Sequence, residues 1–104
     1  MYRIAVCDDE PLMAEQNAAM TRRILDGRGL TAEQDYHIDA FTSPEPLMEQ
    51  LAAQPGAYSL LLLDIELAGE NGVKLASFLR EKRFTASILY ITGHAGFAMD
   101  SFPT

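Results

Sequence analysis

The run Leu60-Leu61-Leu62-Leu63-Asp64 is apolar at every position until it meets an acid. A strand with no polar alternation is buried on both faces, which is typical of a central strand in a parallel sheet. Strand-like and helix-like segments alternate on both sides of this run, and that alternation favours an α/β fold. The stretch therefore predicts a parallel sheet whose central strand ends in a carboxylate.

Further elements are expected on either side of the leucine run. We expect strands at about 3–7, 36–41 and 87–91, and helices at about 11–26, 44–53 and 73–83, with a short helix near 95–101. In the first helix, Met13, Met20 and Ile24 recur at helical spacing and are expected to form the inner stripe. Ser43 is expected to cap the second helix. We expect residues 69–72 to form a loop.

Composition limits the function classes. With 104 residues the chain is long enough for one domain, assigned here to residues 1–104. A net charge of −7 argues against direct binding of nucleic acid, which requires a basic surface. The sequence has neither a long apolar run nor a signal-peptide pattern, so we expect a cytoplasmic protein without a membrane span. The single cysteine, Cys7, is interpreted as a small core residue.

Acidic residues follow two of the expected strands directly. Asp8 and Asp9 come after the first strand, and Asp64 ends the third. Ligands of open α/β sheets bind at the carboxyl ends of the strands, so these acids converge if the two strands are neighbours. Clustered carboxylates repel one another unless a cation neutralises them, and an oxygen-rich site of this kind suits Mg²⁺. A carboxylate can also attack phosphorus, and Thr92, after the fourth strand, could donate a hydrogen bond to the phosphoryl oxygens.

Three segments resemble the signature segments of CheY-like receiver domains. They are Val6-Cys7-Asp8-Asp9-Glu10, Leu62-Leu63-Asp64-Ile65 with Gly69 and Asn71-Gly72 after it, and Tyr90-Ile91-Thr92-Gly93. The run Asp64-Ile65-Glu66-Leu67, and Phe41-Thr42-Ser43 with Leu47, more closely resemble receivers of LytTR-type regulators. The resemblance extends from about residue 2 to the end of the chain.

This resemblance implies a flavodoxin-like, doubly wound sheet in the order 2-1-3-4. It implies a two-component response regulator, not an ordinary enzyme, in which a sensor histidine kinase phosphorylates Asp64 to switch a DNA-binding output domain. Asp9 and Asp64 would bind Mg²⁺ through their side chains, Asp8 directly or through water, and Glu66 through its backbone carbonyl. Thr92 would contact the phosphoryl group, while Glu66 and His94 would tune dephosphorylation.

The sequence departs from the family pattern in two places. Ala68 stands where a proline is common. The chain stops at Thr104, before the fifth strand with its lysine and the fifth helix, and neither Lys74 nor Lys82 occupies that lysine's position. We therefore interpret the chain as a truncated receiver. Since truncation would expose a sheet edge and part of the first helix, we expect a homodimer or a swapped element to cover them.

Two other functions stay open from the residues alone. A small Mg²⁺-dependent phosphatase with an aspartate nucleophile usually carries Asp-x-Asp after its first strand, whereas Asp8 and Asp9 are adjacent here. A receiver-like interaction module that is never phosphorylated is the second alternative. Asp8 and Asp9 could also simply complement the dipole of the following helix. His94 could be a surface residue, and His37 is interpreted as structural.

Overall fold

A computed structural model describes residues 1–64, 69–81 and 86–91 of the chain. Its four strands form one parallel sheet in the order β2-β1-β3-β4. The elements along the chain are β1 (Tyr2–Cys7), α1 (Pro11–Gly27), β2 (Tyr36–Phe41), α2 (Pro44–Ala53), β3 (Leu60–Asp64), α3 (Gly69–Glu81) and β4 (Ser87–Ile91). The predicted fold class and strand order are confirmed. The expected short helix near 95–101 lies outside the described residues.

The leucine run forms β3, next to β1 in the middle of the sheet. Leu61, Leu62 and Leu63 are all buried, as expected for a strand covered on both faces. The register pairs Cys7 of β1 with Leu63 of β3, so the two strands end side by side. Cys7 and Leu63 are each followed by an aspartate, and the sheet therefore brings Asp8 and Asp64 to one edge.

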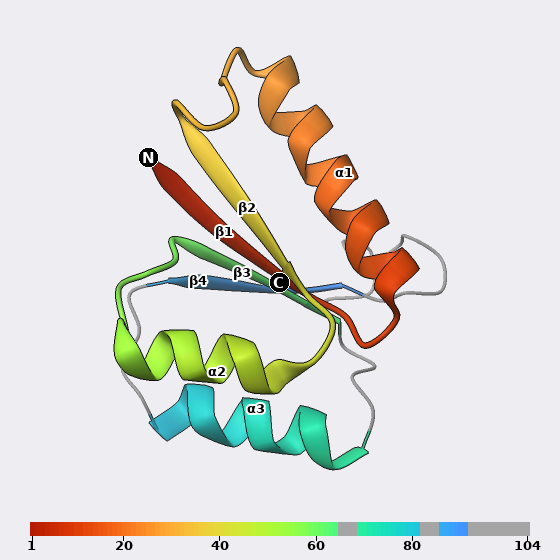
Figure 1. Cartoon of the computed structure of the whole chain (residues 1–104), viewed down its shortest axis with the longest axis vertical. Helices are drawn as coiled ribbons and strands as arrows, with labels where there is room; N and C mark the ends of the chain where they lie inside the picture. The colour runs from red at the N-terminus through yellow and green to blue at the C-terminus, as the bar shows by residue number, and fades with distance from the viewer. Residues whose placement is uncertain (65–68, 82–85, 92–104) are drawn as a thin grey trace.

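Helices cover the two faces of the sheet unequally (Figure 1). On one face, α2 and α3 lie side by side and bury a leucine-rich cluster against β3, made by Leu47, Leu51, Leu61, Leu63, Leu75 and Leu79. On the other face, Ala18 of α1 packs against Ile4, Val6 and Leu62. This division follows from right-handed crossovers between parallel strands, which place α1 opposite α2 and α3.

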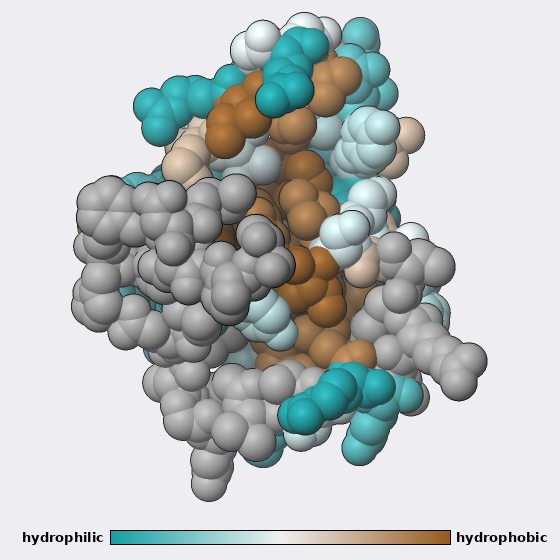
Figure 2. Space-filling model, turned by 180° about the vertical axis from the view of Figure 1, so that it is seen from behind, coloured by the Kyte–Doolittle hydropathy of each residue, from teal (hydrophilic) through white to brown (hydrophobic). Residues whose placement is uncertain are grey.

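The expected inner stripe of α1 is wrong. The buried residues of this helix are Ala14, Ala18 and Thr21, whereas Met20 and Ile24 are 40% and 54% exposed. The small side chains also recur at helical spacing, and they face the sheet in place of the larger ones. Figure 2 shows the molecule from behind, and apolar residues gather in a band down the middle of the face turned to the viewer.

Two predictions about helix starts need correction. Residues 69–72 are not a loop, because α3 begins at Gly69. Glycine costs a helix backbone entropy, but this intrinsic preference is weak and the tertiary context can override it. Ser43 does stand at the N-cap of α2 with an extended backbone, but its side chain makes no capping hydrogen bond.

No helix within residues 1–64, 69–81 and 86–91 combines the length and the apolar character needed to cross a bilayer.

Candidate functional site

Asp8 is held at the end of β1 by backbone hydrogen bonds. Its N–H donates to the carbonyl oxygen of Phe41, 3.0 Å away at the end of β2. Its Oδ1 accepts a hydrogen bond of 3.0 Å from the N–H of Glu10, just before α1 begins. These two contacts fix a carboxyl group that is 1% exposed at the carboxyl edge of the sheet.

Three carboxylates meet at this edge. Asp8, Asp9 and Asp64 can each offer an oxygen such that all three atoms lie within 4.8 Å of one another. Asp8 and Asp64 are buried, whereas Asp9 is exposed, so the group opens to solvent on one side. This geometry agrees with the convergence expected from the strand ends.

At this edge, it is unfavourable for all three carboxyl groups to be ionised when no cation is bound. Burial raises the pKa of Asp8, the hydrogen bond from Glu10 opposes that rise, and the nearby charges of Asp64 and Asp9 raise the pKa further. Among the described residues, Asp8 Oδ2 is a buried oxygen without a hydrogen-bond partner. A hard divalent cation such as Mg²⁺ prefers carboxylate oxygens, and the three aspartates fit that donor preference.

Cys7 lies directly beneath the acidic edge but carries no chemistry of its own. The residue is 1% exposed, and burial, followed by the charges of Asp8, Asp9 and Asp64, raises the pKa of its thiol to about 12. A thiol that stays protonated is a poor nucleophile and a poor metal ligand. The prediction of a core cysteine is confirmed.

The other predicted site residues cannot be placed. Glu66, Thr92 and His94 lie outside the described residues. The structure thus brings together Asp8, Asp9 and Asp64 and leaves the remaining predictions as they stood.

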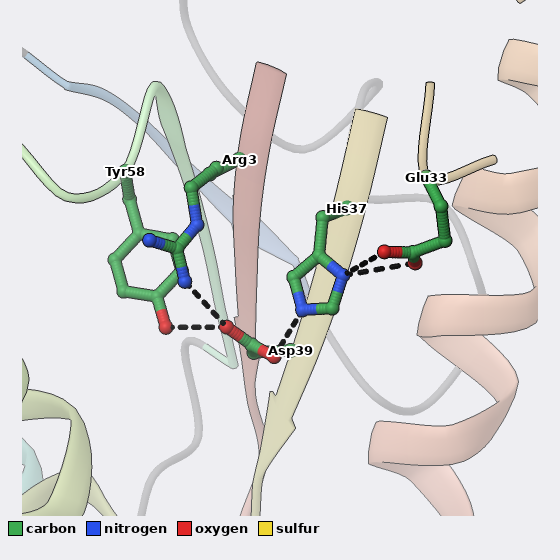
Figure 3. A network of polar contacts seen from close by, with 5 residues as sticks. All are labelled: Arg3, Glu33, His37, Asp39 and Tyr58. Atoms are coloured by element: carbon green, nitrogen blue, oxygen red, sulfur yellow. Dashed lines mark hydrogen bonds and ion pairs between the residues drawn. The ribbon is translucent and has the colours of Figure 1, made fainter. Parts of the chain in front are cut away.

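The structure also contains a second polar cluster, which the sequence pattern does not predict. It contains Arg3, Glu33, His37, Asp39 and Tyr58, and it lies toward the amino ends of β1 and β2 (Figure 3). Alternation along β2 was the one available signal, because it puts His37 and Asp39 on the same face.

Comparisons with known proteins agree on one family. The family model described as response regulator receiver domain matches residues 4–101. Sensory transduction protein LytT of Bacillus subtilis (strain 168) is 28% identical over 98% of this chain and 38% of its own length. Transcriptional regulatory protein NatR of the same organism is 26% identical over 98% of this chain and 40% of its own length. The chain thus spans about two fifths of these curated relatives.

One solved structure of similar fold is a complex with a ligand. Response regulator protein TrrA of Thermotoga maritima, in complex with Mg(2+)-BeF, superposes with a TM-score of 0.62. It is 31% identical, over 97% of this chain and 77% of that one.

Proposed function

Since this chain belongs to the response regulator receiver domain family, a family of signalling domains, we propose that it accepts a phosphoryl group on Asp64. The donor is a phosphohistidine of a sensor histidine kinase. The observation that carries the proposal is the meeting of Asp8, Asp9 and Asp64 at the carboxyl edge of the sheet. A solvated surface acid would have no reason to be buried beside two others.

The transfer step uses an oxygen of the Asp64 carboxylate as the nucleophile. This oxygen forms a bond to phosphorus, while the nitrogen–phosphorus bond of the phosphohistidine breaks and its electron pair returns to the imidazole. The product is an aspartyl phosphate. Because Asp64 is the last residue of β3, its carboxyl group lies at the carboxyl edge of the sheet, which is where ligands of open α/β sheets bind.

Asp8, Asp9 and Asp64 would hold a Mg²⁺ ion at this edge. The buried Asp8 Oδ2 without a partner among the described residues supports this assignment, because a cation would satisfy it. When bound, the ion screens the carboxylates from an anionic donor and stabilises the charge on the transferring phosphoryl oxygens. Asp8 and Asp9 would act by fixing the position of the positive ion beside Asp64.

Three further roles belong to the same proposal and rest on the sequence resemblance alone. Thr92 donates a hydrogen bond to the phosphoryl oxygens, and Glu66 offers its backbone carbonyl to the metal. Glu66 and His94 adjust the rate at which the aspartyl phosphate is hydrolysed.

We also propose the cellular setting of this receiver. Residues 1–104 form one receiver unit that acts in the cytoplasm and switches a DNA-binding output domain. The names of the relatives, a sensory transduction protein and a transcriptional regulatory protein, support this setting.

The test is phosphorylation from a small donor. The purified chain is incubated with Mg²⁺ and acetyl phosphate, and the intact mass is measured. We expect a gain of one phosphoryl group that survives acid and is lost in mild base. Chelation of Mg²⁺ should prevent the gain.

Two variants identify the acceptor. Asp64→Asn should abolish the mass gain, whereas Glu15→Gln, which removes one negative charge from the exposed part of α1, should leave it intact. A modification that persists in Asp64→Asn would refute the assignment of Asp64. Binding of Mg²⁺ with no mass gain would favour the interaction module, and steady hydrolysis of phosphate esters would favour the phosphatase.

A further inference from the structure

His37 lies between two carboxylates. Its Nδ1 is 2.8 Å and 2.9 Å from the two oxygens of Glu33, and its Nε2 is 2.7 Å from Asp39 Oδ1 (Figure 3). Ionised carboxylates only accept hydrogen bonds, and a neutral imidazole has a single N–H to donate. Both contacts can be hydrogen bonds only when His37 is an imidazolium.

One of these contacts joins the sheet to the turn between α1 and β2. Glu33 is the one described non-glycine residue with a positive φ, at +66°, a conformation that most side chains disfavour. Its N–H donates to the carbonyl oxygen of Tyr36 at 2.7 Å, and the N–H of Thr31 donates to Asp35 Oδ2 at 2.7 Å. The carboxylate of Glu33 adds a side-chain link from this turn to the second residue of β2.

The other carboxylate, Asp39, has partners besides the histidine. Its Oδ2 accepts a hydrogen bond of 2.7 Å from the hydroxyl of Tyr58 and lies 3.5 Å from Arg3 Nη2. The Arg3 guanidinium also sits 5.4 Å from the centre of the Tyr58 ring. Asp39 therefore stays anchored to β1 and to the segment before β3 whatever the charge of His37.

The charged groups around His37 come from three directions. Glu33 approaches from the turn and Asp39 from β2 itself, while Arg3 of β1 and the hydroxyl of Tyr58 reach the far oxygen of Asp39. The hydrogen bond to Glu33, and then the one to Asp39, raise the pKa of His37 above its usual value. Burial opposes a charge on Asp39, yet the hydrogen bonds from Tyr58 and His37 lower the pKa of its carboxyl group, which remains an anion.

We propose that His37 is a proton-dependent latch that ties the 31–35 turn to β2. As an imidazolium it donates to both carboxylates. After it loses one proton it can donate to only one of them, and it keeps Asp39. Glu33 is the partner that is released, because its side chain is 69% exposed and water can replace the lost bond, whereas the side chain of Asp39 is 31% exposed.

The sign of the pH dependence follows from the raised pKa. While both carboxylates are ionised, the latch is closed at pH values below about 6.5, the ordinary pKa of histidine, and it opens as the pH rises through the higher pKa of His37 in the folded chain. The stability that it adds to the turn is lost in the same window. The change is local, because Asp39 and its partners do not depend on the second proton.

The latch is tested by nuclear magnetic resonance on the full chain. The ¹⁵N shifts of both imidazole nitrogens of His37 are followed as the pH is raised, together with the hydrogen-exchange protection of the 31–35 amides. We expect both ring nitrogens to carry a proton on the acid side, and a several-fold loss of amide protection with the same midpoint as the imidazole titration. His94, the second histidine of the chain, is assigned by comparison with His37→Gln.

Two substitutions at position 33 separate the latch from the fold. Glu33→Gln removes the anion, and Glu33→Gly does so while favouring the positive φ, so at least one variant keeps the turn. Both should bring the His37 midpoint closer to 6.5, whereas Glu45→Gln on the exposed part of α2 should not. A midpoint unchanged by both variants, or turn protection that does not follow His37, would overturn the proposal.

Discussion

At Asp8, the backbone holds a carboxyl group in a place that disfavours its charge. The residue is buried, one of its oxygens has no hydrogen-bond partner among the described residues, and Asp9 and Asp64 lie close by. Its pKa is raised above that of an ordinary aspartate, mainly by burial. Without a cation, the charged form of Asp8 therefore destabilises the folded chain at neutral pH.

We predict that Asp8→Asn stabilises the metal-free chain. An amide of the same shape removes one of three repelling charges, so the free energy of unfolding at neutral pH should rise by about 1 kcal/mol. In the wild type, stability should increase as the pH falls through the raised pKa of Asp8, and the variant should lack that contribution. Urea denaturation at several pH values in the presence of a chelator measures both effects.

Added Mg²⁺ should stabilise the wild type more than the Asp8→Asn variant. A ligand that binds only the folded state stabilises it, so saturating Mg²⁺ should raise the urea midpoint of the wild type more than that of Asp8→Asn. Equal gains in the two proteins, or a less stable metal-free variant, would argue against a cation site at Asp8.

Individual residues differed in how well the sequence predicted them. Asp8, Asp9 and Asp64 could be found because each follows a recognisable strand, and parallel strands bring their carboxyl ends to one edge. The partners of His37 could not be found in the same way. Glu33 reaches the imidazole through a turn with a positive φ, and neither propensity nor periodicity predicts that conformation for a glutamate.

At the level of elements, α1 shows why a helix can be located and still be rotated wrongly. Its bounds were predicted to within one residue. Its apolar residues, however, allow two neighbouring stripes, one of large and one of small side chains, and periodicity alone does not choose between them. The sheet selects the small stripe of Ala14, Ala18 and Thr21.

The orientation of α1 predicts unequal effects for two substitutions in this helix. Ala18→Leu forces a larger side chain against Ile4, Val6 and Leu62 and should lower the free energy of unfolding by about 2 kcal/mol. Met20→Ala removes an exposed side chain and should change it by roughly 0.5 kcal/mol or less. Thermal and urea denaturation of the two variants will compare them. If Met20→Ala were costly and Ala18→Leu were tolerated, the stripe of large side chains would be the one that faces the sheet, and the orientation of α1 described here would be wrong.

The starts of the helices could be predicted where a residue with a clear positional preference marks them. Pro11 and Pro44 begin α1 and α2, since proline is tolerated where no intrahelical N–H is needed. Gly69, by contrast, begins α3, although the sequence predicts a loop at that position. Glycine signals both turns and helix ends, so the sequence leaves such a boundary ambiguous.

At the scale of the whole molecule, one feature of topology organises the site. The order β2-β1-β3-β4 makes β1 and β3 neighbours, so two segments more than 50 residues apart supply adjacent carboxylates. The leucine run predicted that β3 is central, because it is buried on both faces, whereas the full strand order was implied by the resemblance to receiver domains.

The same order leaves β4 at an edge in the described part of the chain. Ile88, Leu89 and Tyr90 of this strand are each 38% exposed. We predict that the chain self-associates at micromolar concentration through this edge, as measured by analytical ultracentrifugation. Leu89→Lys should shift the distribution toward monomer, because edge lysines oppose pairing, while Gln50→Lys on the exposed part of α2 should not. A monomeric wild type would contradict the prediction.

The central claim is that Asp8, Asp9 and Asp64 form one cation site beside the residue that accepts the phosphoryl group. Anomalous diffraction from crystals of the chain grown with Mn²⁺ in place of Mg²⁺ tests it most directly. We predict a single strong anomalous peak among the three carboxylates, within about 2.0–2.6 Å of oxygens of Asp9 and Asp64. Well-ordered carboxylates with no peak between them, or Asp64 turned away from Asp8 and Asp9, would contradict the account.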